Sequence, residues 1–217
     1  MTSTDARDRL AELAPEDSRA VLRTMLLSRE FDRRAGIFGR QGKAWFHISS
    51  AGHEGLAGAA IPLGPDDIVF PHYRDRALLM MRGMDITDMT RDLVGAPRSP
   101  SGGRNMGSHF SSRRHNVFSI ASPVGSQCLP AAGAAWTQLL NGTDNVVLCS
   151  VGDASTRQGE FYEAVAWAVD LGLPIVFLVS DNGYGISTPT SGLAPVHRPV
   201  LHDGLVQRVD GVCPLAV

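Results

Sequence analysis

The stretch that decides the fold runs from residue 146 to residue 184 and reads VVLCSVGDASTRQGEFYEAVAWAVDLGLPIVFLVSDNGY. Its two apolar runs, residues 146–151 and 175–179, are short, rich in β-branched side chains and followed by glycine and polar residues, which is typical of buried strands. Between them, apolar residues recur at the spacing of a helix. Strand, helix and strand in so short a span predict a right-handed βαβ unit with parallel, neighbouring strands.

The helix between these strands carries its own start and stop signals. Gly172 and Pro174 end it, and we expect Ser155 with Gln158 to cap its start. Its apolar face is formed by Phe161, Ala164, Val165, Ala168 and Val169.

Two polar side chains follow directly after the predicted strands. Asp153 comes after the first strand and Asn182 after the second. Both therefore emerge at the carboxyl ends of parallel strands, the edge where open α/β sheets bind ligands. Carboxylate and amide oxygens suit Mg²⁺, and the turn at residues 152–158 can direct backbone N–H groups at a phosphate. The pattern indicates a metal–phosphate site, although Asp153 could instead serve only as an acid near a helix start.

The rest of the chain gives a coarser pattern. Residues 95–122 are rich in Gly, Ser, Pro, Arg and His, and a loop of this length is more often functional than accidental. The glycines and alanines of residues 52–61 permit close packing. Further helices are predicted at residues 15–38, 52–61, 77–84, 86–94 and 130–140, and a short strand at residues 67–70.

Composition narrows the class of protein. The 217 residues, 43% of them hydrophobic, can bury one substantial core, which predicts one domain. A net charge of −2 gives no electrostatic support for a nucleic acid or an anionic membrane as partner. No run approaches the roughly 18 apolar residues of a membrane span. Cys128, Cys149 and Cys213 show no paired spacing, which is typical of reduced thiols in a cytoplasmic protein.

Three other kinds of site find little support. The sequence contains no P-loop motif, and the segment Gly183–Gly185 lacks the third glycine and the helix of a dinucleotide fingerprint. The spacings of four histidines fit no standard zinc motif. These are His47, His53, His109 and His115.

Gly152–Asp153 followed by Asn182 resembles the thiamine diphosphate motif, in which Ala154 replaces the usual second glycine. The wider resemblance is to the alpha subunit of the first component of the 2-oxo acid dehydrogenases, and most closely to its branched-chain group. The resemblance covers residues 21–217 and rests on eight short motifs that occur in the same order as in the family. These are Arg40–Lys43, Ser50–Gly55, Tyr73–Asp75, Gly103–Met106, Ser122–Gln127, Gly152–Asp153, Gln158–Glu160 and Asp181–Tyr184.

The resemblance implies an α/β thiamine diphosphate-binding fold, a parallel sheet with helices on both faces. We expect residues 1–15 to be a mobile N-terminus and residues 16–217 to form the diphosphate- and magnesium-binding domain, incomplete at its C-terminus. Residues 205–211 resemble a strand from the middle of the family's alpha subunit. Family members continue through further βα units and a loop bearing a cofactor-contacting histidine, so we expect a fragment or the front of a longer gene.

The resemblance also implies a set of cofactor contacts. Magnesium would be held by the side chains of Asp153 and Asn182 and by the backbone carbonyl of Tyr184. Tyr73 and Arg74 would contact the diphosphate, although the sequence alone, without the resemblance, favours a surface pair of Arg74 with Asp75. Val124 would support the cofactor's bent form, unless it is plain core. The full predicted set is His72, Tyr73, Arg74, Ser122, Pro123, Val124, Gly152, Asp153, Ala154, Ser155, Asn182, Tyr184 and Ile186.

The substrate and partners follow from the same resemblance. Phe46 and Met106 would line an apolar pocket for a branched 2-oxo acid together with Tyr73 and Ser122, unless they belong to the ordinary core. The chain would oxidatively decarboxylate the 2-oxo acid and pass the acyl group to lipoamide on an acyltransferase partner. The activating glutamate would come from a beta subunit in an α2β2 tetramer. Two alternatives remain: a non-catalytic binding or assembly module of the same fold, and a pyruvate or acetoin dehydrogenase alpha subunit.

Overall fold

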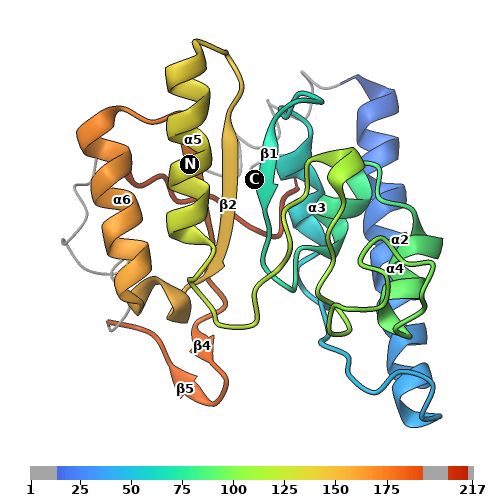
Figure 1. The fold of residues 1–217 in the computed structure, drawn as a ribbon. Coiled ribbons are helices and arrows are strands. Elements are labelled where there is room, and N and C mark those ends of the chain that lie inside the picture. Colours follow the sequence, from blue (N-terminus) through green and yellow to red (C-terminus); the bar gives the residue numbers. More distant parts are fainter. Residues whose placement is uncertain (1–13, 193–204, 215–217) are drawn as a thin grey trace. The chain divides into compact units, whose positions relative to one another are not determined.

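The computed structural model describes residues 14–192 and 205–214, which separate into two compact units (Figure 1). We call them the helical unit and the sheet unit. The helical unit contains the described residues up to Leu63, Tyr73–His115 and those from Arg208 onward, and the sheet unit contains Gly64–His72 and Asn116–Gln207. Most of the predicted mobile segment, residues 1–13, lies outside the described residues. The single domain expected at residues 16–217 stays a prediction.

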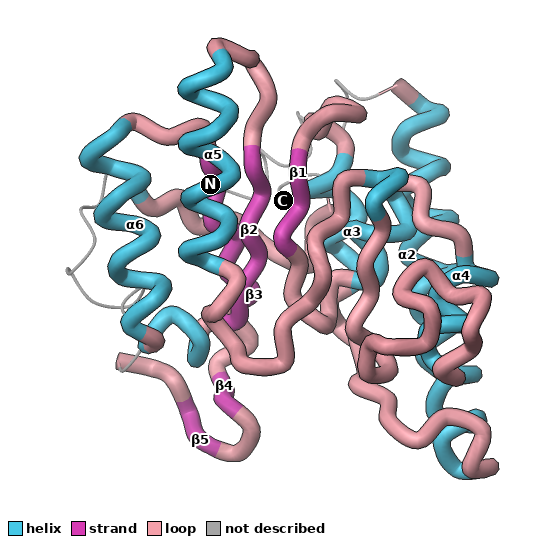
Figure 2. Tube along the Cα trace, in the orientation of Figure 1, coloured by secondary structure: helices cyan, strands magenta, loops and turns pink. Residues whose placement is uncertain are grey.

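The sheet unit is built on three parallel strands in the order β1-β2-β3 (Figure 2). β1 is Ile68–Phe70, β2 is Val147–Gly152 and β3 is Ile175–Ser180. Phe70 pairs with Cys149, which pairs with Phe177. The predicted βαβ unit with parallel, neighbouring strands is therefore confirmed.

Two helices cover one face of this sheet. α5, Cys128–Asn141, and α6, Gly159–Leu171, lie side by side against it (Figure 1). Alternate residues of β2 enter their shared core because successive strand side chains point to opposite faces. The buried residues of this core are Phe70, Cys128, Ala131, Ala132, Ala135, Val147, Cys149, Val151, Phe161, Ala164 and Leu173. The predicted α/β architecture, a parallel sheet flanked by helices, is confirmed.

The start of α6 differs from the prediction, whereas its end agrees. A 3₁₀ turn, η3 at Ala154–Arg157, lies between β2 and α6, and no side chain caps the helix at its N-cap residue Gln158. Ser155 sits inside this turn, so its hydroxyl is one turn too early to reach the first N–H groups of α6. The predicted cap by Ser155 and Gln158 is wrong. Gly172 ends α6 in the left-handed conformation, as expected.

A short hairpin that the sequence pattern does not reveal follows β3. β4, Tyr184–Gly185, pairs antiparallel with β5, Thr188–Pro189. It lies beyond the carboxyl ends of β2 and β3 and contacts η3 (Figure 2). The hairpin therefore borders the sheet edge at which the sequence predicts a ligand site.

The helical unit consists of α2, Pro15–Arg40, with the short α3, Arg76–Met81, and α4, Ile86–Leu93. α2 begins with a proline and two acids, which suit the first turn of a helix. The 3₁₀ helices η1, Glu54–Ala60, and η2, Arg113–His115, complete it. Residues 95–122 carry no α-helix or named strand, in agreement with the predicted loop. No helix in the described part of the chain is long and apolar enough to cross a membrane.

Two predictions are corrected around η1. Residues 52–61 contain a 3₁₀ helix, η1 at Glu54–Ala60, and no α-helix. Its Gly55 lies against other backbone, since an added Cβ there would lie 2.4 Å from the Gly211 carbonyl oxygen. Residues 205–211 form no strand. A strand needs a sheet edge to pair with, whereas the backbone from Gly211 to Pro214 packs on Gly55 and Gly58.

Candidate cofactor and metal site

Asp153 lies at the centre of the candidate site in the sheet unit. Its side chain is buried at the carboxyl end of β2, and its N–H donates to the Ser180 carbonyl at the end of β3, 3.2 Å away. The backbone carbonyl of Asp153 accepts from the Thr156 hydroxyl at 2.6 Å. Its carboxylate does not cap η3 but accepts a hydrogen bond from the hydroxyl of Thr190. Asp153 is thus the N-cap residue of η3, but its carboxylate bonds to Thr190 and not to an N–H group of that turn.

Asn182 and Tyr184 follow β3 on the same edge. The Asn182 amide oxygen accepts the Tyr184 N–H at 3.0 Å, which fixes its direction and uses one of its two lone pairs. Both side chains are exposed, and Ile186 stands fully exposed at the tip of the hairpin. The structure thus brings one buried carboxylate and one exposed amide to neighbouring strand ends.

The remaining predicted cofactor residues of the sheet unit border this edge. His72 is buried, and a Cβ at Gly152 would lie 3.8 Å from its Nε2 and 3.6 Å from the Ser155 hydroxyl. Gly125 packs so closely on η3 that an added Cβ would lie 2.9 Å from that of Gln158. The segment Ser122–Val124, half-buried at Val124 and exposed at the other two residues, therefore approaches η3 through Gly125.

The donor set fits a hard cation. Asp153, Asn182 and the Tyr184 carbonyl offer only oxygen atoms, and Mg²⁺ takes few protein oxygens when phosphate and water supply the others. Within the described ranges, no three His, Cys, Asp or Glu residues gather as a metal-binding group. A magnesium site with a single carboxylate does not require such a group. These donors are of the kind that could hold a hard cation together with a phosphate.

Tyr73 and Arg74 belong to the helical unit. The Arg74 guanidinium lies 5.3 Å from the centre of the Tyr73 ring and donates to the backbone carbonyl of Ser49. Asp75 is 0% exposed, so the alternative of a surface pair between Arg74 and Asp75 does not apply. Arg74 thus contacts the loop that follows α2.

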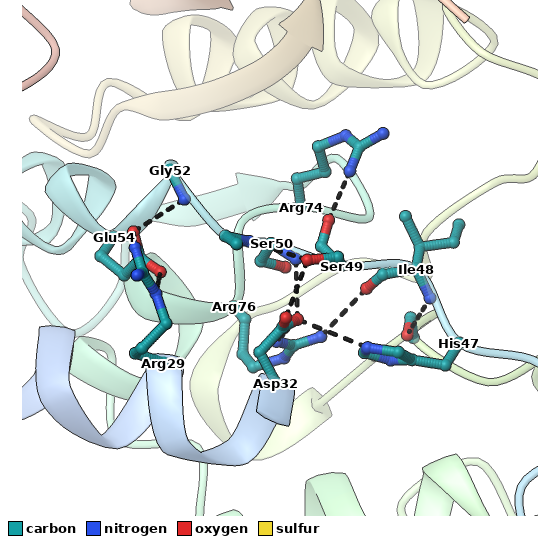
Figure 3. Close-up of polar contacts among 12 residues, drawn as sticks. Arg29, Asp32, His47, Ile48, Ser49, Ser50, Gly52, Glu54, Arg74 and Arg76 are labelled. Atoms are coloured by element: carbon teal, nitrogen blue, oxygen red, sulfur yellow. Dashed lines mark hydrogen bonds and ion pairs between the residues drawn. The ribbon is translucent and has the colours of Figure 1, made fainter. Parts of the chain in front are cut away.

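A buried ion pair anchors that loop (Figure 3). Arg76, 0% exposed, stacks over Phe31 and donates to Asp32 Oδ1 at 2.7 Å. Asp32 also accepts from the Ser50 N–H at 2.8 Å and from the Ser49 hydroxyl at 2.7 Å. One carboxylate of α2 therefore holds two consecutive loop residues, and the carbonyl of one of them receives Arg74.

A second acid ties the same loop to α2 (Figure 3). Glu54 accepts two hydrogen bonds from Arg29, at 2.5 and 2.9 Å, and one from the Gly52 N–H at 2.9 Å. Burial acts to raise the pKa of Glu54, but the hydrogen bonds from Arg29 and from backbone N–H groups, together with the charge of Arg29, leave this pKa below its ordinary value. The loop is thus held at both ends by ionised carboxylates.

The charges around Asp32 shift two pKa values. Burial acts to raise the pKa of Asp32, but hydrogen bonds from Arg76, Ser50 and Ser49 bring it below its ordinary value. His47 lies 3.5 Å from Asp32, and its pKa is lowered, first by burial and then by the charge of Arg76. A carboxylate and a neutral imidazole are therefore the favoured forms at neutral pH.

The predicted substrate residues lie partly together. His109 is buried between Phe46 and Tyr73, with each ring centre 6.3 Å from its own, and its Nδ1 lies 3.0 Å from the Gly107 carbonyl. Met106 is half-buried and its carbonyl accepts the His109 N–H. The rings of Phe46 and Tyr73 and the backbone of Met106 thus contact one histidine in the helical unit, whereas Ser122 belongs to the sheet unit.

Sequence reasoning missed three contributors. No sequence pattern points to Thr190, because the polar segment Thr188–Thr190 does not indicate which other residues it contacts in the fold. For His109 the sequence indicates only a poor fit to a zinc motif, although this residue follows the family motif Gly103–Met106 by three positions. The ion pair of Asp32 and Arg76 is only weakly indicated by the sequence. Each of the two charged residues stands next to an apolar residue of a predicted helix.

These features define an α/β protein with a candidate oxygen-donor site at the carboxyl edge of a parallel sheet. The family model described as dehydrogenase E1 component matches residues 22–212. The chain therefore belongs to the dehydrogenase E1 component family. This membership, with the parallel sheet, also confirms the predicted thiamine diphosphate-binding fold class.

Curated relatives agree with this family. The chain is 34% identical over 180 residues to the 2-oxoisovalerate dehydrogenase subunit alpha of Bacillus subtilis, covering 82% of this chain and 54% of the relative. It is 33% identical over 189 residues to the mitochondrial subunit alpha 1 of Arabidopsis thaliana, covering 82% and 39%. The mitochondrial subunit of Mus musculus is 31% identical over 180 residues, covering 82% and 41%. The chain thus spans about half or less of these relatives.

Proposed function

We propose that this chain is the magnesium- and diphosphate-binding part of a 2-oxo acid dehydrogenase alpha subunit. The observation that supports this most is the placement of Asp153 and Asn182 at the ends of paired parallel strands in a member of the dehydrogenase E1 component family. Asp153, Asn182 and the Tyr184 carbonyl would hold Mg²⁺, and the ion would bind the diphosphate. One carboxylate and a diphosphate carry more than enough negative charge to neutralise the cation, so no further acids are required.

Thiamine diphosphate would supply the decarboxylation chemistry when bound. The residues of the chain bind and orient it. Arg74 suits a phosphate oxygen because its guanidinium donates in a fixed geometry, and Tyr73 adds a hydroxyl. The N–H groups of the turn that follows Gly152 would face the diphosphate. His72, Ser122, Pro123, Val124, Ala154, Ser155 and Ile186 complete the proposed contacts.

We propose a branched 2-oxo acid as the substrate. Phe46 and Met106 offer half-buried apolar surface, which suits an aliphatic side chain. The three relatives described above are named for 2-oxoisovalerate, a branched 2-oxo acid. A pyruvate or acetoin dehydrogenase subunit is the alternative, and relative kcat/KM values for the acids would separate the two.

The proposed partners are a beta subunit in an α2β2 tetramer and a lipoyl acyltransferase. The names of the relatives specify an alpha subunit, which supports a second kind of subunit. The activating glutamate would belong to the beta subunit, because neither Glu160 nor Glu163 of α6 matches it. We place the protein in the cytoplasm, since its three cysteines form no disulfide; the relatives from plant and mouse are mitochondrial.

A non-catalytic module of the same fold is the second candidate. The departure from the cofactor motif at Ala154 favours it. Such a module would bind magnesium and diphosphate weakly or not at all, and co-expression with a beta subunit would restore no turnover.

Calorimetric titration of the chain with thiamine diphosphate, with and without Mg²⁺, tests the proposal. Asp153→Ala should weaken Mg²⁺-dependent binding by more than roughly a hundredfold, because losing even a residue that only orients a metal ligand costs 10- to 100-fold. Asp170→Ala, which removes an exposed acid from α6, is the matched control. Equal affinity in wild type and Asp153→Ala would refute the magnesium assignment.

A further inference from the structure

The orientation of the Asp153 carboxylate depends on a residue far along the chain. The Thr190 hydroxyl donates to Asp153 Oδ2, and both side chains are buried. A carboxylate can rotate about its last bond, so a hydrogen bond to one oxygen fixes the direction of the other. Thr190 therefore decides where the second oxygen of Asp153 points.

The hairpin of β4 and β5 brings Thr190 to this position. The Thr190 N–H donates to the Gly183 carbonyl at 2.9 Å, directly beyond the pairing of Tyr184 with Pro189. The hairpin opens immediately after Asn182, the other proposed side-chain ligand. The hairpin is thus connected to both proposed side-chain ligands. It follows Asn182 in the chain, and it contacts Asp153 through the hydroxyl of Thr190.

A single methyl group sets how closely this hairpin approaches η3. A Cβ at Gly185 would lie 2.7 Å from the Cβ of Ala154, closer than two such carbons can come. The alanine side chain cannot rotate away, so one of the two positions must lack a Cβ. Ala154 is the position at which the cofactor motif normally has glycine. Its methyl group is accommodated here because residue 185 is glycine.

We propose that Ala154 and Gly185 form a complementary pair that seats the hairpin, and that Thr190 is thereby a positioning residue for the Asp153 carboxylate. This inference rests on the proposed function of Asp153 as a magnesium ligand. It explains the departure at Ala154 as a change matched across the contact, and not as a loss of the site. Alanine could occupy either position 154 or position 185, provided that the other position is glycine.

Four chains test the seating: wild type, Gly185→Ala, Ala154→Gly and the double variant with both changes. Gly185→Ala should weaken Mg²⁺-dependent thiamine diphosphate binding and the hydrogen-exchange protection of the Thr190 amide, each by roughly five- to a hundredfold, as overpacking commonly does. The double variant should recover both to within about threefold of wild type. Gly133→Ala is the matched control, because its added methyl group meets no atom within 4 Å.

Two substitutions test the hydroxyl itself. Thr190→Val keeps the branched shape but removes the donor, so it should weaken Mg²⁺-dependent binding roughly 10- to 100-fold. Thr190→Ser keeps the donor and should bind within about threefold of wild type. A merely structural role would not separate these two variants in affinity at equal melting temperature.

The outcomes are distinguishable. A double variant as impaired as Gly185→Ala, or a Thr190→Val chain that binds like wild type, would overturn the inference while magnesium binding by Asp153 stands. A wild-type chain without Mg²⁺-dependent binding would refute the proposed function and, with it, the positioning role. Exchange of the Thr190 amide would still decide the seating of the hairpin in that case, since it needs no ligand.

Discussion

Asp32→Ala should be among the most destabilising single substitutions in the helical unit. It removes the acceptor of Arg76, of the Ser50 N–H and of the Ser49 hydroxyl at once. Arg76 is 0% exposed and cannot turn to water. Its remaining partners are the Ile48 carbonyl at 3.3 Å and the face of the Phe31 ring.

The expected loss follows from the charge left behind. Breaking a buried ion pair by removing one partner costs about 3–5 kcal/mol. Asp32 lies partly exposed and Arg76 keeps two weaker contacts, so we expect the lower part of this range, about 3 kcal/mol. Replacing Arg76 as well removes the uncompensated charge. The double variant Asp32→Ala with Arg76→Met should therefore be more stable than Asp32→Ala alone.

Urea unfolding followed by circular dichroism measures the effect as a shift in midpoint at constant slope. Glu30→Ala is the matched control, because Glu30 lies on the same helix and also pairs with arginines, Arg33 and Arg34, but at the surface. It should leave the midpoint nearly unchanged. A loss below about 1 kcal/mol for Asp32→Ala, or a double variant less stable than the single one, would refute the reasoning.

Three further results are expected. Asp32 and Glu54 have pKa values below those of an unfolded chain, so their contribution to stability is complete above about pH 5 and is lost as the pH falls through their folded pKa values; urea midpoints from pH 7 to pH 3 should drop less in Glu54→Gln than in wild type. This chain alone should release no carbon dioxide from 3-methyl-2-oxobutanoate, because the activating glutamate is expected from a beta subunit; release above a no-enzyme control would contradict that assignment. In a tetramer reconstituted with a beta subunit, Phe46→Ala should reduce the preference for 3-methyl-2-oxobutanoate over pyruvate, itself only about 10- to 200-fold for a pocket that discriminates methylene groups; a wild type that prefers pyruvate would exclude the branched-chain assignment.

The local pattern was sufficient for the sheet unit. β2, α6 and β3 could be predicted because period, length and the handedness of βαβ connections all constrain the same short segment. The same constraints predict that Asp153 and Asn182 lie at one edge of the sheet. The packing of η1 could not be predicted in this way, because the backbone of Gly211 and Pro214, which lies against Gly55 and Gly58, comes from the other end of the chain.

The side-chain partners of the site escaped prediction for the same reason. Thr190 reaches Asp153 across 37 residues, and Arg76 reaches Asp32 across 44. No periodic pattern encodes such distant pairs. The resemblance identifies the residues of the motif but not the contact between Ala154 and Gly185. That contact arises because the hairpin packs beside η3.

The contact of residues 211–214 with η1 has a consequence for folding during synthesis. The helical unit is discontinuous in sequence, since its first part ends at Leu63 and its last begins at Arg208. At about 5–20 residues per second, a ribosome would expose Gly55 and Gly58 many seconds before their backbone partners emerge. Contacts of such long separation slow folding. The nascent chain should therefore hold α2 and η1 incompletely packed until the sheet unit has been made.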